Sequence, residues 1–259
     1  VRPEMFTYFF AGIFFWLLWR YHKSELRRNW LFLLPVIEII WVNFHIGFFF
    51  GELLIMIFLI GGLFPFSKIQ TKKIIFLGLI LLLSFLATLA NPNGFQGATY
   101  PCRIFQHYGY LIVENQSIRF LEKLGHTQGL NFGLFKLGVG LLVLSFLVNL
   151  SKKQIPPLFL FLLGALVSVM AFMGIRNFPF FGFFALPIIA LNLNFLQQLK
   201  KKHIFVACGL IILGSAINDY AILKERVQTF GIGLMPNVNA SAEFLKEQKI
   251  QGQIFNNYD

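Results

Sequence analysis

The stretch "WVNFHIGFFFGE", residues 41–52, lies inside an almost uninterrupted apolar run from Trp30 to Phe66. Asn, His and Glu are costly inside a lipid bilayer, so an apolar run is expected to accept them where it turns or lines a polar cavity. We therefore predict two apolar helices, 29–43 and 47–65, joined by a tight turn that carries the Asn, the His and a Gly.

The whole chain has the composition of a membrane protein. Of its 259 residues, 57% are hydrophobic and 13% are charged, and the mean hydropathy is +0.69, whereas a soluble domain has about 25% charged residues. Apolar runs of this length predict an all-α polytopic transmembrane helical bundle. About eight spans are expected, at residues 3–19, 29–43, 47–65, 73–91, 131–150, 156–175, 177–196 and 203–220.

Lys and Arg indicate the orientation of these spans, because positive residues collect in cytoplasmic loops. They are concentrated in alternate connections, which predicts that residues 21–28, 66–72, 151–155 and 197–202 are cytoplasmic. The long polar loop 92–130 and both ends of the chain are then extracytoplasmic. The net charge of +11 follows from this topology, and a nucleic-acid partner has no support.

The ends of the chain suggest an internal fragment of a longer protein. It begins Val1-Arg2-Pro3, without an initiator Met or a signal pattern, and it stops at "FNNYD". We interpret 1–220 as a transmembrane domain that is incomplete at its N-terminus, and 221–259 as the start of an extracytoplasmic segment. Cys102 and Cys208 do not suggest a disulfide framework.

Two acidic residues lie within the predicted spans on either side of the turn. Glu38 is five residues before Asn43, and Glu52 is five residues after Gly47, so each lies about 7.5 Å below the turn at 1.5 Å rise per residue. An intramembrane acid costs about 2.5–3.5 kcal/mol. Either the two acids join helices, protonated or paired with His45 or an outer Arg, or they line a polar cavity.

Further polar residues fall at the predicted outer ends of helices. Arg176 has either a structural role, as an anchor at the interface or a partner of Glu38 or Glu52, or a binding role. In the binding role it holds a phosphate, which its planar guanidinium does better than Lys. The candidate substrate-binding residues are Arg2, Glu38, Asn43, His45, Glu52, Glu114, Asn115, Arg176 and Asn177. His45 is equally compatible with a structural turn, Gly47 and Gly51 with close helix packing, and "LANPNGF" (89–95) with a helix end.

Motifs for other chemistry do not occur in the sequence. It contains no Walker loop, dinucleotide fingerprint, serine elbow or Cys/His zinc spacing. We therefore expect neither a cofactor nor a metal, and no residue of this chain can be assigned as a catalytic base.

Several short motifs together carry a resemblance: "RPEMFTY", "WVNFHIGFFFG", "LANPNGF", "IVENQS", "RNFPFF" and "FNNYD". With them the chain resembles uncharacterised bacterial polytopic membrane proteins that look like the GT-C glycosyltransferase superfamily, which includes protein O-mannosyltransferases and lipid A aminoarabinose transferases. The resemblance implies a sugar donor on a polyprenyl phosphate, an extracytoplasmic acceptor and a place in the bacterial inner membrane and cell envelope. The catalytic acid of such enzymes follows the first helix, so it is expected upstream of Val1.

Two other classes of function stay open at this point. In a membrane transporter or lipid flippase, Glu38, His45 and Glu52 would relay protons, although no inverted repeat is visible. A noncatalytic membrane scaffold subunit is the third alternative.

Overall fold

The computed structural model describes residues 3–64, 71–103, 113–125 and 130–193, and a few positions beyond them, 213, 243–244 and 246–249. Helices and no strands are found in these residues. The chain divides into two compact units, Val1–Leu196 and Gln197–Asp259. Nearly all described residues belong to the first unit, and the predicted domain boundary at residue 220 lies outside them.

Seven long helices of the first unit correspond to seven of the predicted apolar segments. They are α1 (Glu4–His22), α2 (Leu33–Phe44), α3 (Phe49–Leu63), α4 (Thr71–Ala87), α8 (Leu130–Ser151), α9 (Leu158–Met173) and α10 (Phe178–Asn192). The predicted segment 203–220 lies outside the described residues. The all-helical fold is therefore confirmed.

Within the described part of the chain, three helical segments are long and apolar enough to cross a membrane: Ile46–Leu63, Asn131–Ser151 and Ile175–Asn192. Leu158–Met173 is apolar but shorter. These segments support a membrane protein, while the count of eight spans stays a prediction.

Short helical segments connect the long helices. They are η1 (Arg28–Phe32), η2 (Ile46–Phe48), α5 (Gly94–Ala98), α6 (Tyr100–Arg103), η4 (Val113–Asn115), α7 (Ile118–Lys123) and η5 (Ile175–Asn177). α2 begins four residues later than the predicted segment, at Leu33, which places Pro35 in its first turn, where a missing N–H is tolerated. The tight turn predicted between the second and third helices is His45 followed by η2.

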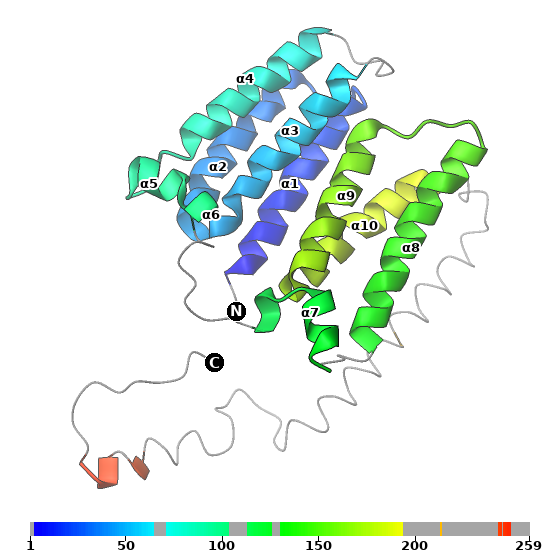
Figure 1. The fold of residues 1–259 in the computed structure, drawn as a ribbon. Helices are drawn as coiled ribbons and strands as arrows, with labels where there is room; N and C mark the ends of the chain where they lie inside the picture. Colours follow the sequence, from blue (N-terminus) through cyan, green and yellow to red (C-terminus); the bar gives the residue numbers. More distant parts are fainter. Residues whose placement is uncertain are drawn as a thin grey trace. The chain divides into compact units, whose positions relative to one another are not determined.

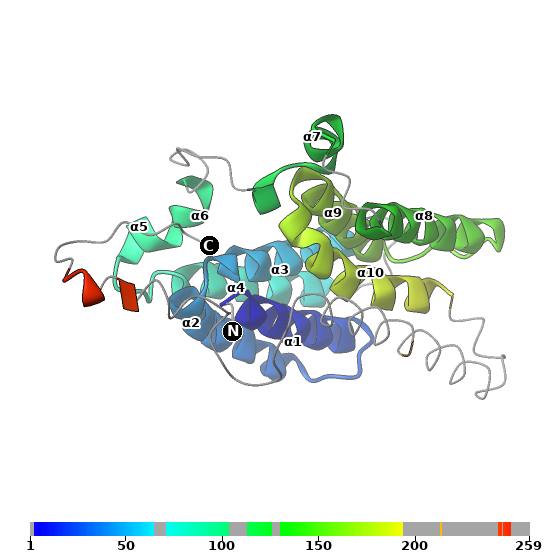
Figure 2. The same ribbon diagram turned by 90° about the horizontal axis from the view of Figure 1, so that it is seen from below.

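The first unit contains two neighbouring groups of helices (Figures 1 and 2). In the first group, α2 and α3 each pack against both α1 and α4. In the second, α10 packs against α8 and α9. Phenylalanine pairs join the groups, with ring centroids 4.2 Å apart for Phe58–Phe159 and 4.3 Å for Phe50–Phe180.

Glycine allows the two groups to approach closely at one point. A Cβ on Gly61 of α3 would lie 3.0 Å from the backbone nitrogen of Phe159 in α9. Because backbone atoms cannot move aside as a side chain can, a larger residue at position 61 would push the two helices apart.

Burial differs strongly among the three candidate spans. In Ile46–Leu63, 61% of the apolar stretch is buried inside the protein, compared with 22% of that in Asn131–Ser151. α3 is therefore the central helix. α8 exposes a row of leucines, including Leu137, Leu141 and Leu144, as a helix facing lipid does.

Candidate functional site

Polar side chains from distant parts of the sequence meet where α1 and α10 begin. Asn43 at the end of α2 donates to the carbonyl of Ala90, just after α4, at 2.8 Å. Arg176 in η5 contacts residues of α1 and η4. We call this end of the first unit the Arg176 end. Of the polar residues predicted at the outer ends of helices, Asn43, His45 and Arg176 are thus gathered at one end, and which side of a membrane it faces is a prediction.

Arg176 is the centre of the first polar group, the Arg176 cluster, with Glu4, Glu114 and Asn115. Its Nη2 forms an ion pair and hydrogen bond with Glu4 Oε1 and lies 3.9 Å from Glu114 Oε1. Its Nη1 donates to Asn115 Oδ1 at 3.0 Å. The acidic partners of Arg176 are therefore Glu4 and Glu114, and no ion pair with Glu38 or Glu52 occurs among the described residues.

Backbone contacts fix the position of this cluster. The N–H of Ile175 donates to the carbonyl of Gln116 at 3.2 Å, which holds η5 against the segment after η4. Asn177 uses one amide N–H to bind the carbonyl of Met170 at 2.9 Å, closing the turn between α9 and α10. The side chain of Arg176 is still 36% exposed, so part of its guanidinium can reach a ligand.

His45 is the centre of a second group, the Thr7–His45 network. Its Nδ1 lies 2.7 Å from the Thr7 hydroxyl and accepts the Gly47 backbone N–H at 3.1 Å. The Thr7 hydroxyl in turn accepts the indole N–H of Trp41 at 3.3 Å. Thr7 therefore donates to His45, and Nδ1, which accepts twice, carries no proton.

This arrangement favours a neutral His45 with its proton on Nε2. Burial lowers the pKa of His45 below its usual 6.5, Glu4 raises that pKa, and Arg176 lowers it. A proton on Nδ1 would face the N–H of Gly47 and break that hydrogen bond, and the bond with Thr7 would have to reverse its direction. The network is therefore intact only when His45 is neutral.

Glu38 of α2 and Glu52 of α3, which we call the buried acid pair, lie beneath this network within the first group of helices. Glu38 is 0% exposed and Glu52 is 5% exposed, and none of their four carboxyl oxygens has a hydrogen-bond partner. A Cβ on Gly51 would lie 2.7 Å from Glu38 Oε2, so Glu38 reaches across to α3 at the residue before Glu52. The two acids are close enough to interact electrostatically.

Both acids are thus enclosed by protein rather than exposed to lipid. The predicted pairing of either acid with His45 or an outer Arg does not occur among the described residues. Gly47 and Gly51 do allow close packing, as Thr7 and Phe14 of α1 lie within 3 Å of a Cβ at these two positions.

Apart from the buried acid pair, the described candidate residues separate into three roles in this geometry. Arg176 and Asn115 belong to one cluster with Glu114, His45 belongs to another network, and Asn43 and Asn177 bond backbone carbonyls. Arg2 lies outside the described residues. The binding role of these residues stays a prediction.

Sequence reasoning missed Glu4, Thr7 and Trp41. Glu4 is acidic in the first turn of α1, where the helix dipole favours a carboxylate, so its position in the sequence does not by itself indicate a site. Its contact with Arg176, 172 residues away, could only come from the fold.

Two cavities described in the first unit lie apart from these residues. One, of about 950 Å³, is at the opposite end, and the other, of about 310 Å³, lies between α1 and α10. Neither is lined by Arg176, His45, Glu38 or Glu52. Among the described residues, no group of three or more His, Cys, Asp or Glu could hold a metal ion.

Comparison of the chain with models of protein families, with curated proteins and with solved structures gives no match.

Proposed function

We propose that this protein is an integral membrane glycosyltransferase-like protein that transfers a sugar from a polyprenyl-phosphate donor to an extracytoplasmic acceptor. Its eight spans cross the bacterial inner membrane, with the Arg176 end outside and the Lys- and Arg-rich connections in the cytoplasm. The resemblance to GT-C enzymes supports this proposal. So does the gathering of Arg176, Asn115 and His45 at one end of apolar helices.

The observation that carries the proposal is the partly exposed Arg176, held in place by two separate segments. A polyprenyl chain stays in lipid while its phosphate reaches the outer ends of the helices. The cation of the protein that binds this phosphate must therefore lie at the outer ends of the helices. Arg176 has five N–H donors, and Glu4 and Asn115 orient its fork. The phosphate takes the exposed part of the guanidinium and shares it with these partners.

Glu4 and Glu114 make this proposal specific. A phosphate that approaches Arg176 also approaches two carboxylates, so donor binding requires that Glu114, 3.9 Å from Nη2, be displaced. Glu114→Gln should then strengthen donor binding, because it removes like charge while keeping a polar side chain. Arg176→Ala should weaken donor binding, and Arg176→Lys should weaken it less.

The experiment is sugar transfer by the purified full-length protein in lipid, with the concentration of a labelled polyprenyl-phosphate sugar varied. The expected result is a raised donor KM in Arg176→Ala and a lowered one in Glu114→Gln. Arg119→Ala is the matched control, since Arg119 is exposed on α7 in the same segment of chain. If Arg176→Ala keeps the donor KM and the rate of the parent, the phosphate role is wrong.

The buried acid pair favours a second candidate function, proton-coupled transport or lipid flipping. Two enclosed carboxyl groups without hydrogen-bond partners can exchange protons as their surroundings change. In vesicles containing the protein, an imposed pH gradient should then drive substrate movement, and Glu38→Gln with Glu52→Gln should abolish it. Sugar transfer that survives both substitutions, without any gradient-driven movement, would exclude this alternative.

A further inference from the structure

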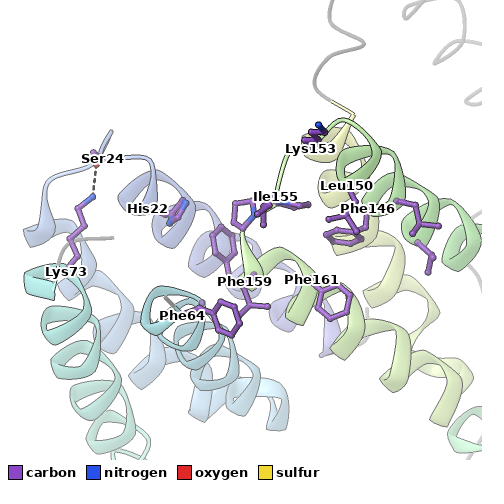
Figure 3. A pocket seen from close by; sticks show the side chains of 16 residues that line it. His22, Ser24, Phe64, Lys73, Phe146, Leu150, Lys153, Ile155, Phe159 and Phe161 are labelled. Carbon is purple, nitrogen blue, oxygen red and sulfur yellow. Dashed lines mark hydrogen bonds between the residues drawn. The ribbon is translucent and has the colours of Figure 1, made fainter. Parts of the chain in front are cut away.

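A cavity of about 950 Å³ opens at the end of the first unit opposite the Arg176 end (Figure 3). We call this end of the first unit the Lys73 end. The cavity lies between the ends of α1, α3 and α4 on one side and those of α8 and α9 on the other. Its volume is at the upper limit of ordinary ligand pockets, about 300–1,000 Å³.

The walls of the cavity are apolar. They include Phe64, Phe146, Leu147, Leu150, Phe159 and Phe161. Several of these side chains are more than half exposed, among them Leu147, Leu150 and Phe161. Such a wall binds hydrocarbon, and its exposure leaves room for a chain to enter from the side.

The mouth of the cavity is basic. Lys73 donates from Nζ to Ser24 Oγ at 2.7 Å and to the carbonyl of Tyr21 at 3.2 Å. These two bonds hold its ammonium at the rim and leave one of its three N–H groups for an anion. Lys153 lies across the cavity from Lys73 (Figure 3) and is exposed. The described lining residues include no acid.

We propose that this cavity binds an anionic phospholipid, with its acyl chains against the phenylalanine and leucine wall and its headgroup phosphate at Lys73 and Lys153. An apolar wall beneath a basic rim matches a phospholipid in both chemistry and order, and basic pockets between membrane helices bind anionic headgroups. The site goes beyond sugar transfer and uses none of the residues at the Arg176 end. It rests on the membrane setting of the proposed function.

Native mass spectrometry of the purified full-length protein tests this proposal. Phosphatidylglycerol and phosphatidylcholine with identical acyl chains are added separately, and the fraction of protein with bound lipid is measured. The parent should prefer phosphatidylglycerol, and each lysine should contribute about fivefold. The double variant Lys73→Gln/Lys153→Gln should therefore bind the two lipids about equally.

Two further variants keep the result interpretable. Lys136→Gln is the matched control, because Lys136 is paired with Glu122 and does not line the cavity, and it should keep the preference. Val143→Trp places a large ring at the apolar wall and should reduce binding of both lipids. Thermal unfolding of each variant shows whether it is folded.

Three outcomes would overturn the proposal. They are equal binding of the two lipids by the parent, an unchanged preference in the folded double variant, and unchanged binding in folded Val143→Trp. The last two results would mean that lipid binds elsewhere or that another part of the chain fills the cavity. None of them bears on donor binding at Arg176, so the proposed sugar transfer is tested separately.

Discussion

At the Arg176 end, side-chain bonds join segments that are far apart in sequence, whereas at the Lys73 end the side chains surround an open cavity. Arg176 connects α1 with η4, and His45 connects the turn before α3 with α1. At the opposite end, Lys73 of α4 bonds Tyr21 and Ser24 at the end of α1, beside a cavity of about 950 Å³.

The difference shows how one set of helices can combine rigidity with binding. Ion pairs and hydrogen bonds at the Arg176 end hold α1, η4 and η5 together, so a ligand there would meet a preorganised cation. At the Lys73 end the described lining residues include two lysines and no acid, which leaves room for an anion. The buried acid pair takes part in neither set of contacts, since none of its carboxyl oxygens has a hydrogen-bond partner.

Gly47→Ala should have the largest effect on stability. The new Cβ would overlap Thr7 Oγ1 and lie 3.0 Å from His45 Nδ1, so Thr7 must move and its hydrogen bonds must break. We expect a loss of about 1–3 kcal/mol in the free energy of unfolding, measured in detergent micelles.

Gly78→Ala is the matched control for this substitution. Gly78 is also helical, and a Cβ added there would meet nothing within 4 Å, so alanine at this position should stabilise the helix by about 0.5–1 kcal/mol. Equal effects of the two substitutions would show that the Arg176 end is loosely packed.

Glu38→Met should have the next largest effect, with the opposite sign. It removes a buried carboxyl group without hydrogen-bond partners and keeps the length of the side chain, so the free energy of unfolding should rise by about 1 kcal/mol. Glu38→Gln keeps a buried polar group and should stabilise less. A loss of stability in Glu38→Met would mean that the carboxyl group has a bonded partner in the membrane.

Much of the fold could be predicted from the sequence because apolar runs are local signals. Seven predicted segments became helices, and the turn at His45 was expected from the polar residues within an apolar run. α2 nevertheless begins later than predicted, after η1, and the polar loop 92–130 contains short helices such as α7. A local cap begins α7, where Ser117 accepts the N–H of Phe120, whereas no side chain caps the start of α2.

The candidate site could be predicted only in part, because its contacts are not local. Polarity marked Arg176, Asn115 and His45, and two of these do meet in the Arg176 cluster. The sequence offered no means of choosing Glu4 rather than Glu38 or Glu52 as the partner of Arg176. That choice depends on which helices pack together, and neither periodicity nor charge contains this information.

Arg176→Ala should lower the free energy of unfolding by about 1 kcal/mol or less, because the ion pairs of Arg176 are partly exposed. This loss is smaller than the one expected for Gly47→Ala. The substitution separates the structural role of Arg176 from its proposed binding role, because donor binding should weaken strongly while stability changes little. Limited proteolysis of the segment around η4 measures the structural part, and Glu4→Gln should give a similar increase in cleavage. A proteolysis rate equal to the parent's would mean that Arg176 does not hold this segment.

Acidification should have the smallest effect, and it tests the Thr7–His45 network. Burial holds the pKa of folded His45 below 6.5, so both states are neutral above that pH. As the pH falls through 6.5, the unfolded chain takes up a proton before the folded protein does, and stability declines until the lower, folded pKa is reached. We expect His45 to contribute about 1–2 °C to the fall in the midpoint of thermal unfolding between pH 7.5 and 5.5, in addition to the contribution of His22, whose pKa burial lowers to about 4.

His45→Asn isolates this contribution from that of other groups. Asn has a side-chain oxygen that can accept the N–H of Gly47 but does not titrate, so the variant should lose part of the pH dependence while keeping the turn. The measurement is the difference in midpoint between the two pH values, compared for parent and variant. An equal difference in both would show that His45 accepts protons in the folded protein as readily as in the unfolded chain. The hydrogen bonds at Nδ1 would then not hold it neutral.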